Sequence, residues 1–208
     1  GDWTIASANT TSTTFTVTPT ANAVCLNRAS HPARDSGYGF RSMPPALALA
    51  YANFYSTLSA ARRNALLAKM NEWVTDNIRF RGSAGHPGNN FYTGYLRGYA
   101  FLMAALDGAG TSLETTVDGQ YAYFRDTFIT YANRWYPNGA NLQGLRNYGW
   151  GLTEHLAQSF LAAHEAGDDW SALSPYFRTQ LEWYMAQSHT TLASLDDADW
   201  VAYTVPVE

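Results

Sequence analysis

Several features that define common protein classes are scarce in this sequence. Cys25 is the only cysteine, which excludes an intrachain disulfide and a thiolate metal cluster. Charged residues make up only 14% of the chain, and the formal net charge is -4. No basic block occurs, so nucleic acid is not an expected partner. No apolar run is long enough to span a bilayer, so we expect no membrane partner either.

Apolar and aromatic residues, by contrast, are abundant. Hydrophobic residues make up 46% of the 208 residues, and aromatic residues make up 15%, as seven Trp, fourteen Tyr and ten Phe. This composition is typical of a globular protein, and the length suits one domain with a sizeable core. The aromatic content also favours a groove lined by aromatic side chains.

The start of the chain differs in composition from the rest. Thr, Ser and Ala dominate residues 1–24, and their alternation with β-branched residues predicts short strands near Thr4–Ile5 and Thr14–Thr18. This texture is common in exported bacterial proteins and predicts a secreted or periplasmic location. We therefore expect three parts: an extended, β-like segment at 1–36, a helical domain at 37–195 and an extended tail at 196–208.

Beyond residue 40 the spacing of apolar residues is helical. Ser59 and Ser112 are suitable N-caps, and Gly108 and Gly167 stand just past helix ends, where a left-handed residue is favoured. Apolar residues recur at intervals of three and four, which predicts helices at 44–57, 59–79, 91–107, 113–135, 147–166 and 170–191.

The predicted helices recur as three similar pairs. The first helix of each pair opens with an aromatic–glycine cluster, in "SGYGFRSMPPALALAYANF", "NFYTGYLRGYAFLMAALDG" and "NYGWGLTEHLAQSFLAAHEAG". Gly39, Gly94 and Gly151 mark this pattern at intervals of about 55 residues. Such a period predicts a mostly α protein, with three helical hairpins in a partial (α/α) toroid or curved stack. The Ala-rich first helices should form the buried row and the more amphipathic second helices the outer row.

Polar and aromatic residues crowd the start of the helix predicted at 91–107. Small residues such as Gly98 are explained by close helix packing, but packing does not account for Asn89, Asn90 and Tyr92. In a curved array of hairpins these helix ends would converge on one face, where a ligand would bind. The alternative is that Asn89 and Asn90 simply form the turn and cap the helix.

Residues 37–191, with the stretch "NNFY" in front of an inner helix, resemble the (α/α)-toroid polysaccharide lyases of the alginate-lyase and chondroitin/hyaluronan-lyase type. The resemblance implies a carbohydrate-active domain that performs β-elimination on an acidic glycan, a polymer of uronic acid. Those toroids contain more hairpins than the three predicted here. The chain would therefore be a fragment of a longer protein with further domains, or it would close differently.

The resemblance also implies roles for particular residues. An amide, from Asn89 or Asn90, would neutralise the substrate carboxylate, which makes the neighbouring C5 proton more acidic. Tyr92, Tyr148 and His155 would transfer protons. The other matching residues would bind substrate, because arginine contacts carboxylates in a bidentate manner and aromatic rings stack on sugars; these residues are Arg41, Arg97, Arg146, Tyr38 and Trp150.

Other interpretations stay open. His155 also suits an interior, hydrogen-bonded histidine, and the chain also suits a non-catalytic module that binds glycan or docks a neighbouring domain. Glycosidase chemistry would need a second carboxylate beside Glu154, and none is placed there by the repeat. Asp168 and Asp169 better suit the start of the last helix. The stretch "HEAGDD" at 164–169 lacks the second histidine of a zinc-binding helix, so we expect no metal and no other cofactor.

Overall fold

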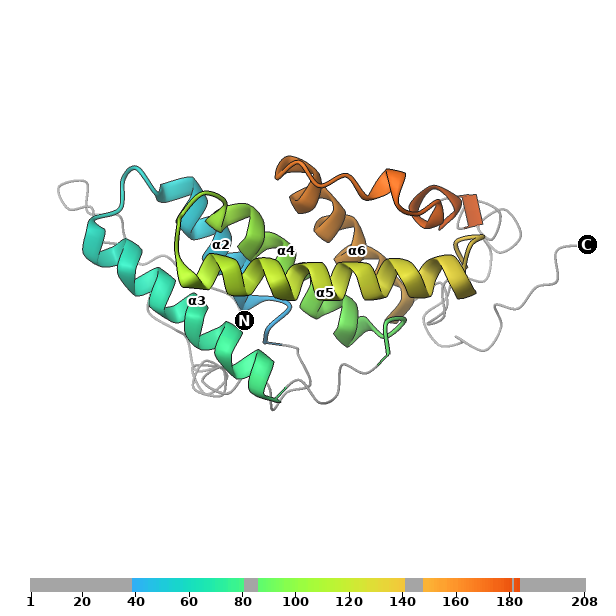
Figure 1. Ribbon diagram of the computed structural model, residues 1–208, viewed down its shortest axis with the longest axis horizontal. Coiled ribbons are helices and arrows are strands. Elements are labelled where there is room, and N and C mark those ends of the chain that lie inside the picture. The colour runs from blue at the N-terminus through green and yellow to red at the C-terminus, as the bar shows by residue number, and fades with distance from the viewer. Residues whose placement is uncertain (1–38, 81–85, 141–147, 181, 184–208) are drawn as a thin grey trace, which may run out of the picture.

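The computed structural model describes residues 39–80, 86–140, 148–180 and 182–183, and Figure 1 shows this part of the chain as helices joined by turns. The prediction of a mostly α protein is therefore confirmed. The predicted strands near Thr4–Ile5 and Thr14–Thr18, and the predicted tail at 196–208, lie outside the described residues.

The limits of the helices follow the apolar periodicity to within a few residues. Pro44 and Pro45 stand in the first turn of the first described helix. Backbone N–H groups have no partner within the helix in this turn, so proline, which lacks an N–H, is tolerated there. The bounded elements are α2 (Met43–Phe54), α3 (Ala60–Phe80), α4 (Asn90–Leu106), α5 (Ser112–Trp135), α6 (Tyr148–Glu165) and the short 3-10 helix η2 (Trp170–Ala172).

The prediction of one continuous helix from residue 170 to residue 191 is wrong at its start, where the short helix η2 stands instead. Asp169 caps η2, and its side chain accepts a hydrogen bond from the Ser171 N–H at 2.9 Å. The chain leaves the helical conformation after Ala172 and becomes helical again over residues 176–180. Pro175 explains the break, because proline disfavours helical backbone in the residue before it, here Ser174.

The N-cap of α5 is Thr111, so the prediction of Ser112 was wrong by one residue. The Thr111 side chain accepts a hydrogen bond from the Glu114 N–H at 3.1 Å, and the Glu114 carboxylate in turn accepts one from the Thr111 N–H. This reciprocal pair is a capping box, which typically stabilises a helix by about 1 kcal/mol. Glu114 also accepts a hydrogen bond from the N–H of Gly108, whose φ of 73° is the left-handed conformation predicted for it.

The helix α4 lies at the centre of the described fold and contacts α2, α5 and α6. Every residue of α4 is at least partly buried, as predicted for an inner helix. The side chain of Arg97 reaches the Arg41 carbonyl just before α2, and Thr93 reaches His155 in the first half of α6. Later residues of all three helices line one groove. The helices α2, α4 and α6 therefore run parallel, whereas α3 and α5 pack against α2 and α4 respectively.

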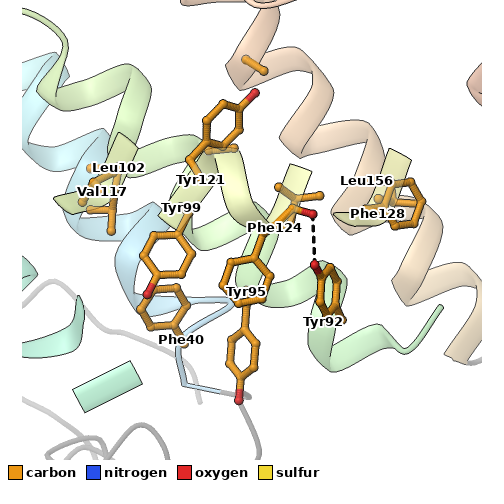
Figure 2. Close-up of a cluster of buried hydrophobic side chains, with 14 of the residues drawn as sticks. Phe40, Tyr92, Tyr95, Tyr99, Leu102, Val117, Tyr121, Phe124, Phe128 and Leu156 are labelled. Atoms are coloured by element: carbon orange, nitrogen blue, oxygen red, sulfur yellow. Dashed lines mark hydrogen bonds between the residues drawn. The ribbon is translucent and has the colours of Figure 1, made fainter. Parts of the chain in front are cut away.

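Aromatic rings fill the space between α4 and α5 (Figure 2). Tyr99 stacks on Phe124 with ring centroids 5.4 Å apart, and Phe40 lies 4.8 Å from Tyr99. Gly98 makes this arrangement possible, because a Cβ atom at this position would lie 2.5 Å from Cε1 of Phe40. The glycine in the middle of α4 is therefore required by close packing, as the sequence predicted.

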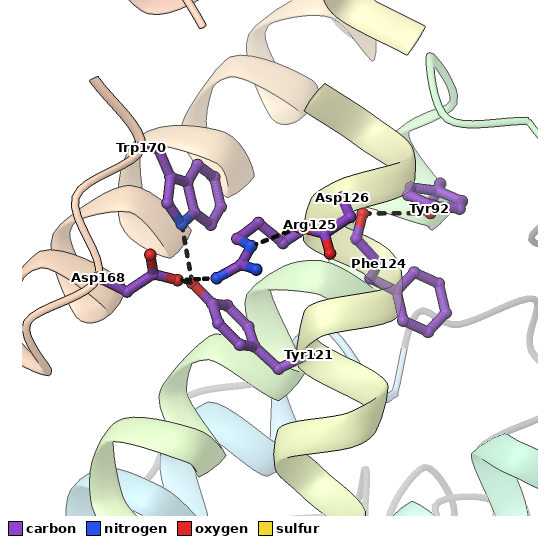
Figure 3. A network of polar contacts seen from close by, with 7 residues as sticks. All are labelled: Tyr92, Tyr121, Phe124, Arg125, Asp126, Asp168 and Trp170. Atoms are coloured by element: carbon purple, nitrogen blue, oxygen red, sulfur yellow. Dashed lines mark hydrogen bonds and ion pairs between the residues drawn. The ribbon is translucent and has the colours of Figure 1, made fainter. Parts of the chain in front are cut away.

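A polar network joins α5 to the segment that follows α6 (Figure 3). The Asp168 carboxylate accepts hydrogen bonds from the Tyr121 hydroxyl and from the Arg125 guanidinium, both at 2.5 Å. The indole N–H of Trp170 donates to the Tyr121 hydroxyl at 2.7 Å. Burial, followed by the hydrogen bond to Asp168, raises the pKa of Tyr121. Asp168 thus fixes the segment after α6 against α5. Both Asp168 and Asp169 were expected at the start of the last helix, but only Asp169 forms an N-cap, that of η2.

Candidate functional site

The asparagines at the start of α4 have separate roles. Asn89 is the N-cap, and its side-chain oxygen accepts a hydrogen bond from the Phe91 N–H at 2.8 Å. Asn90 is the first residue of the helix and is 4% exposed, and its backbone carbonyl accepts a hydrogen bond from the Thr93 hydroxyl at 3.2 Å. The capping alternative therefore accounts for Asn89, whereas Asn90 faces the interior of the protein.

His155 on α6 lies against this end of α4, close to Asn90. Its ring nitrogen Nδ1 is 3.4 Å from the Thr93 hydroxyl oxygen, and the ring also bonds to the Asn90 backbone. Burial, and then the charges of Arg41 and Arg97, lower the pKa of His155 to about 4. The imidazole is 5% exposed and neutral at pH 7, as expected of an interior, hydrogen-bonded histidine.

The predicted arginines Arg41 and Arg97 meet beside His155. The Nη1 atom of Arg97 donates to the Arg41 carbonyl at 3.0 Å. Burial lowers the pKa of Arg97, Glu154 opposes this shift, and Arg41 adds to it. Gly94 allows the contact, because a Cβ atom there would lie 2.8 Å from the Cβ of Arg41. The two glycines of α4 thus allow Phe40 and Arg41 to pack closely on this helix. Arg41 lies against Gly94, and Phe40 lies against Gly98.

Tyr92, the third predicted catalytic residue with a described side chain, points to α5. Its hydroxyl donates to the Phe124 carbonyl at 3.2 Å, and its ring lies 4.9 Å from the Phe124 ring (Figure 2). It is 3% exposed. Tyr92 is therefore part of the aromatic core, in contact with α5, whereas the contacts of His155 are with Asn90 and Thr93 of α4.

The remaining predicted site residues are not described fully enough to place their side chains. Tyr148 is the first residue of α6 and Trp150 lies in its first turn, but nothing is described of their side chains. Tyr38 and Arg146 lie outside the described residues. Their predicted roles stay predictions.

An apolar groove of about 310 Å³ follows the same parallel helices beyond the arginines. Phe101, which lines the groove, is one turn after Arg97, and their guanidinium-to-ring distance is 6.0 Å. Leu49 and Leu161 are unusually exposed for their type, at 49% and 59%. The walls include Ala48 and Leu49 of α2, Phe101 and Ala105 of α4, and Leu161 and Ala162 of α6. We call this groove together with Arg41 and Arg97 the inner face.

The sequence interpretation expected a groove lined by aromatic side chains, whereas alanine and leucine line most of this groove. A signal for it was present: Ala104 and Ala105 are too small to fill the space between three parallel helices, but they were interpreted only as a packing surface. Gln158 also lines the groove; its side-chain oxygen is buried and has no hydrogen-bond partner among the described residues. Its amide nitrogen donates to Glu154 at 2.9 Å.

Two further features are absent from the described residues. No group of three or more His, Cys, Asp and Glu side chains is placed to hold a metal ion there. Within the same residues, no helix has the length and apolarity that crossing a membrane requires.

No protein-family model, no curated protein and no solved structure matches this chain.

Proposed function

We propose that this chain is a carbohydrate-active helical domain that binds an acidic polysaccharide along its inner face. The observation that supports this most strongly is the parallel course of α2, α4 and α6, which gathers Arg41 and Arg97 at one end of a groove. A polymer chain needs an open, elongated site, and an acidic one also needs cations for its carboxylates. The inner face offers an open groove with two arginines at one end of it.

The electrostatics of this end of the inner face favour an anionic ligand. Guanidinium groups bind carboxylates through paired hydrogen bonds, and Arg97 is half-buried, where such bonds are stronger than in bulk water. The N-termini of α2, α4 and α6 lie at the same end, and each contributes a partial positive charge. Glu154 partly offsets this charge, so a ligand carboxylate would compete with Glu154 for Arg97.

The helical arrangement that we propose for the complete domain is an incomplete (α/α) toroid. The parallel row of α2, α4 and α6, with α3 and α5 packed on its other side, supports this arrangement. Among the described residues the row ends at α2 and at α6, and further hairpins of a longer protein would pack against these two helices. Export from the cell fits this role, because acidic polysaccharides are largely extracellular.

Lyase-like β-elimination is a second candidate function, favoured by the contact of the His155 ring with the Asn90 backbone. A neutral imidazole accepts a proton, and an amide neutralises a carboxylate by hydrogen bonding. Both residues are buried, however, so a substrate would reach them only if the start of α4 moved away from α6. Binding without catalysis by these residues is therefore the better-supported function.

Titration of the protein with acidic and neutral polysaccharides tests the proposal. We expect alginate, polygalacturonate or hyaluronan to bind and dextran not to bind, with weaker binding at higher salt. Arg97→Gln and Arg41→Gln should each weaken binding by about tenfold, equivalent to about 1.4 kcal/mol. Arg62→Gln removes an exposed charge on α3 and should leave binding unchanged.

The proposal fails if none of the acidic polymers binds the wild-type protein, or if Arg62→Gln weakens binding as much as Arg97→Gln. The melting temperature of each variant shows whether a loss of binding reflects a loss of folding. The same mixtures test the lyase function, because β-elimination creates an unsaturated uronide that absorbs ultraviolet light. If no such absorbance develops while binding persists, the domain binds without cleaving.

A further inference from the structure

A second cleft, of about 300 Å³, opens where α2 and α4 end. Its walls include Tyr51 of α2, Tyr55 just after that helix, and Asp107 and Gly108 just after α4. It shares Ala52 and Ala105 with the apolar groove, so the two openings adjoin along the inner face. Its lining is more polar than that of the groove, which is built mainly of Ala, Leu and Phe.

The two tyrosines present a fixed aromatic surface to this cleft. Tyr51 is buried, and its ring meets that of Tyr55 edge to face with centroids 5.3 Å apart. Tyr55 is 49% exposed. Arg63 of α3 holds it in place, with its guanidinium carbon 4.7 Å from the ring centroid and its Nη1 atom donating to the Tyr55 carbonyl at 3.1 Å. A ring that is both exposed and already positioned loses little conformational entropy when a ligand packs on it.

Asp107 adds a hydrogen-bond acceptor to the same cleft. It is exposed, it is the C-cap of α4, and its carboxylate forms no hydrogen bond or ion pair within the part of the chain that the structure describes. A carboxylate accepts two hydrogen bonds from neighbouring hydroxyl groups, and it also binds an ammonium group. A tyrosine ring beside a carboxylate therefore suits a sugar, which has an apolar C–H face and a rim of hydroxyl groups.

The charge around Asp107 is opposite to that at the arginine end. Partial burial raises the pKa of Asp118, and the negative charges of Glu114 and Asp107 raise it further, so these carboxylates lie close enough to interact. The C-terminal end of α4 adds a partial negative charge. Arg63 opposes this charge on the α3 side of the cleft, where its guanidinium lies on the Tyr55 ring. Near Asp107 the environment disfavours a uronate and favours an uncharged sugar or a protonated amino sugar.

We propose that the cleft of Tyr51, Tyr55 and Asp107 is a second sugar subsite, which takes an uncharged or amino sugar. This inference deepens the proposed function and rests on it, because the subsite would bind another part of the polysaccharide held by Arg41 and Arg97. From Arg97 to Asp107 the helix α4 rises by about 15 Å, at roughly 1.5 Å per residue. That distance separates different sugar units of one chain, so each end of the inner face selects its own unit.

Saturation-transfer NMR with small sugars tests the subsite without the polymer. The probes are methyl glucoside, N-acetylglucosamine, glucosamine and galacturonate. We expect transfer from the wild-type protein to at least one of the first three. A galacturonate signal would report on the arginine end and should be lost in Arg97→Gln. Tyr55→Leu and Asp107→Asn should each reduce the transfer at least fivefold. Asp76→Asn, on α3 and away from the cleft, should leave it unchanged.

The possible results separate this inference from the proposed function. The subsite is rejected if no uncharged or amino sugar receives saturation from the wild-type protein, or if transfer persists in both Tyr55→Leu and Asp107→Asn. Tyr55 and Asp107 are exposed, so both variants should fold, and circular dichroism confirms this. If the small sugars bind but no acidic polymer does, the subsite stands and the proposed function fails. If an acidic polymer binds but no uncharged or amino sugar does, the proposed function stands and the subsite fails.

Discussion

The two sides of α4 differ in how they use the space around them. Towards α5, Tyr92, Tyr95 and Tyr99 pack their rings around Phe124, and all of these side chains are at most 3% exposed. Towards α2 and α6, small residues such as Ala105 leave a groove of about 310 Å³. One helix thus supplies both a filled core and an open surface. The size of its side chains, rather than their polarity, separates the stabilising side from the side available for binding.

Removal of Phe124 should have the largest effect on stability. Its ring contacts Tyr92, Tyr95 and Tyr99 and is 1% exposed. We expect Phe124→Ala to lower the free energy of unfolding by about 4 kcal/mol, because truncation of a buried aromatic ring removes transfer energy and leaves a cavity. Urea denaturation measures this value. A loss of less than about 1 kcal/mol would show that the α5 side of α4 is not the stabilising side.

Acidification should destabilise the α4–α6 interface through His155. Its pKa is about 4 in the folded protein and about 6.5 when unfolded, so the unfolded state binds more protons between these values. The free energy of unfolding should therefore fall as the pH drops from about 6.5 to about 4, by about 3 kcal/mol from this residue.

The matched variant His155→Gln isolates this effect from that of the carboxylates. Urea denaturation of both proteins at several pH values gives two slopes, and the carboxylates contribute to both equally. We expect the slope to be smaller in the variant. Equal slopes in the two proteins would mean that His155 is protonated as readily in the folded state as in the unfolded state. The imidazole would then not be buried away from water.

A side chain at Gly98 should destabilise the protein, because Phe40 already occupies the space beside it. A substitution at Gly119 is the matched control. A Cβ atom on Gly98 would meet Phe40 at 2.5 Å, but one on Gly119 would meet nothing within 4 Å. We expect Gly98→Ala to cost about 2 kcal/mol through overpacking. Gly119→Ala should stabilise α5 by about 0.5–1 kcal/mol, since alanine favours the helix. Thermal unfolding measures both, and stabilisation by Gly98→Ala would contradict the close contact with Phe40.

The smallest effect is expected on the groove side. Leu161 is 59% exposed on the groove wall, so Leu161→Asn should change the free energy of unfolding by less than about 0.5 kcal/mol. Chemical denaturation checks this. A loss of several times that size would mean that the groove side also stabilises the fold, and the contrast between the two sides of α4 would disappear.

The helices could be predicted from the sequence because their determinants are local. Apolar spacing places α3 and α5 to within a residue or two, and Gly108 and Gly167 adopt the expected positive φ. The errors were also local in origin. Thr111 forms the capping box with Glu114 three residues later, a pattern that the choice of Ser112 overlooked. Pro175 breaks the last helix, although its signal is present in the sequence.

The candidate site was less predictable because it depends on distant contacts. The sequence placed Asn90 and His155 in one region, and they do meet. Their burial could not be predicted, because it depends on the packing of α6 against α4. Likewise, the contact of Arg97 with Arg41 needs Gly94 to seat the turn before α2, a fit that spans more than fifty residues of sequence. Residue types indicated the chemistry, but only the packing shows which side chains are accessible to a ligand and which are buried.

The most direct test of the inner face is to map backbone amide shifts by NMR while an oligouronate is added. We predict that the shifts concentrate at Arg41, Arg97 and Glu154 and along the groove, while α3 and the outer side of α5 stay unchanged. Shifts confined to α3 or α5, or no shifts at oligouronate concentrations that saturate other uronate-binding proteins, would contradict the assignment of α2, α4 and α6 as a polysaccharide-binding face.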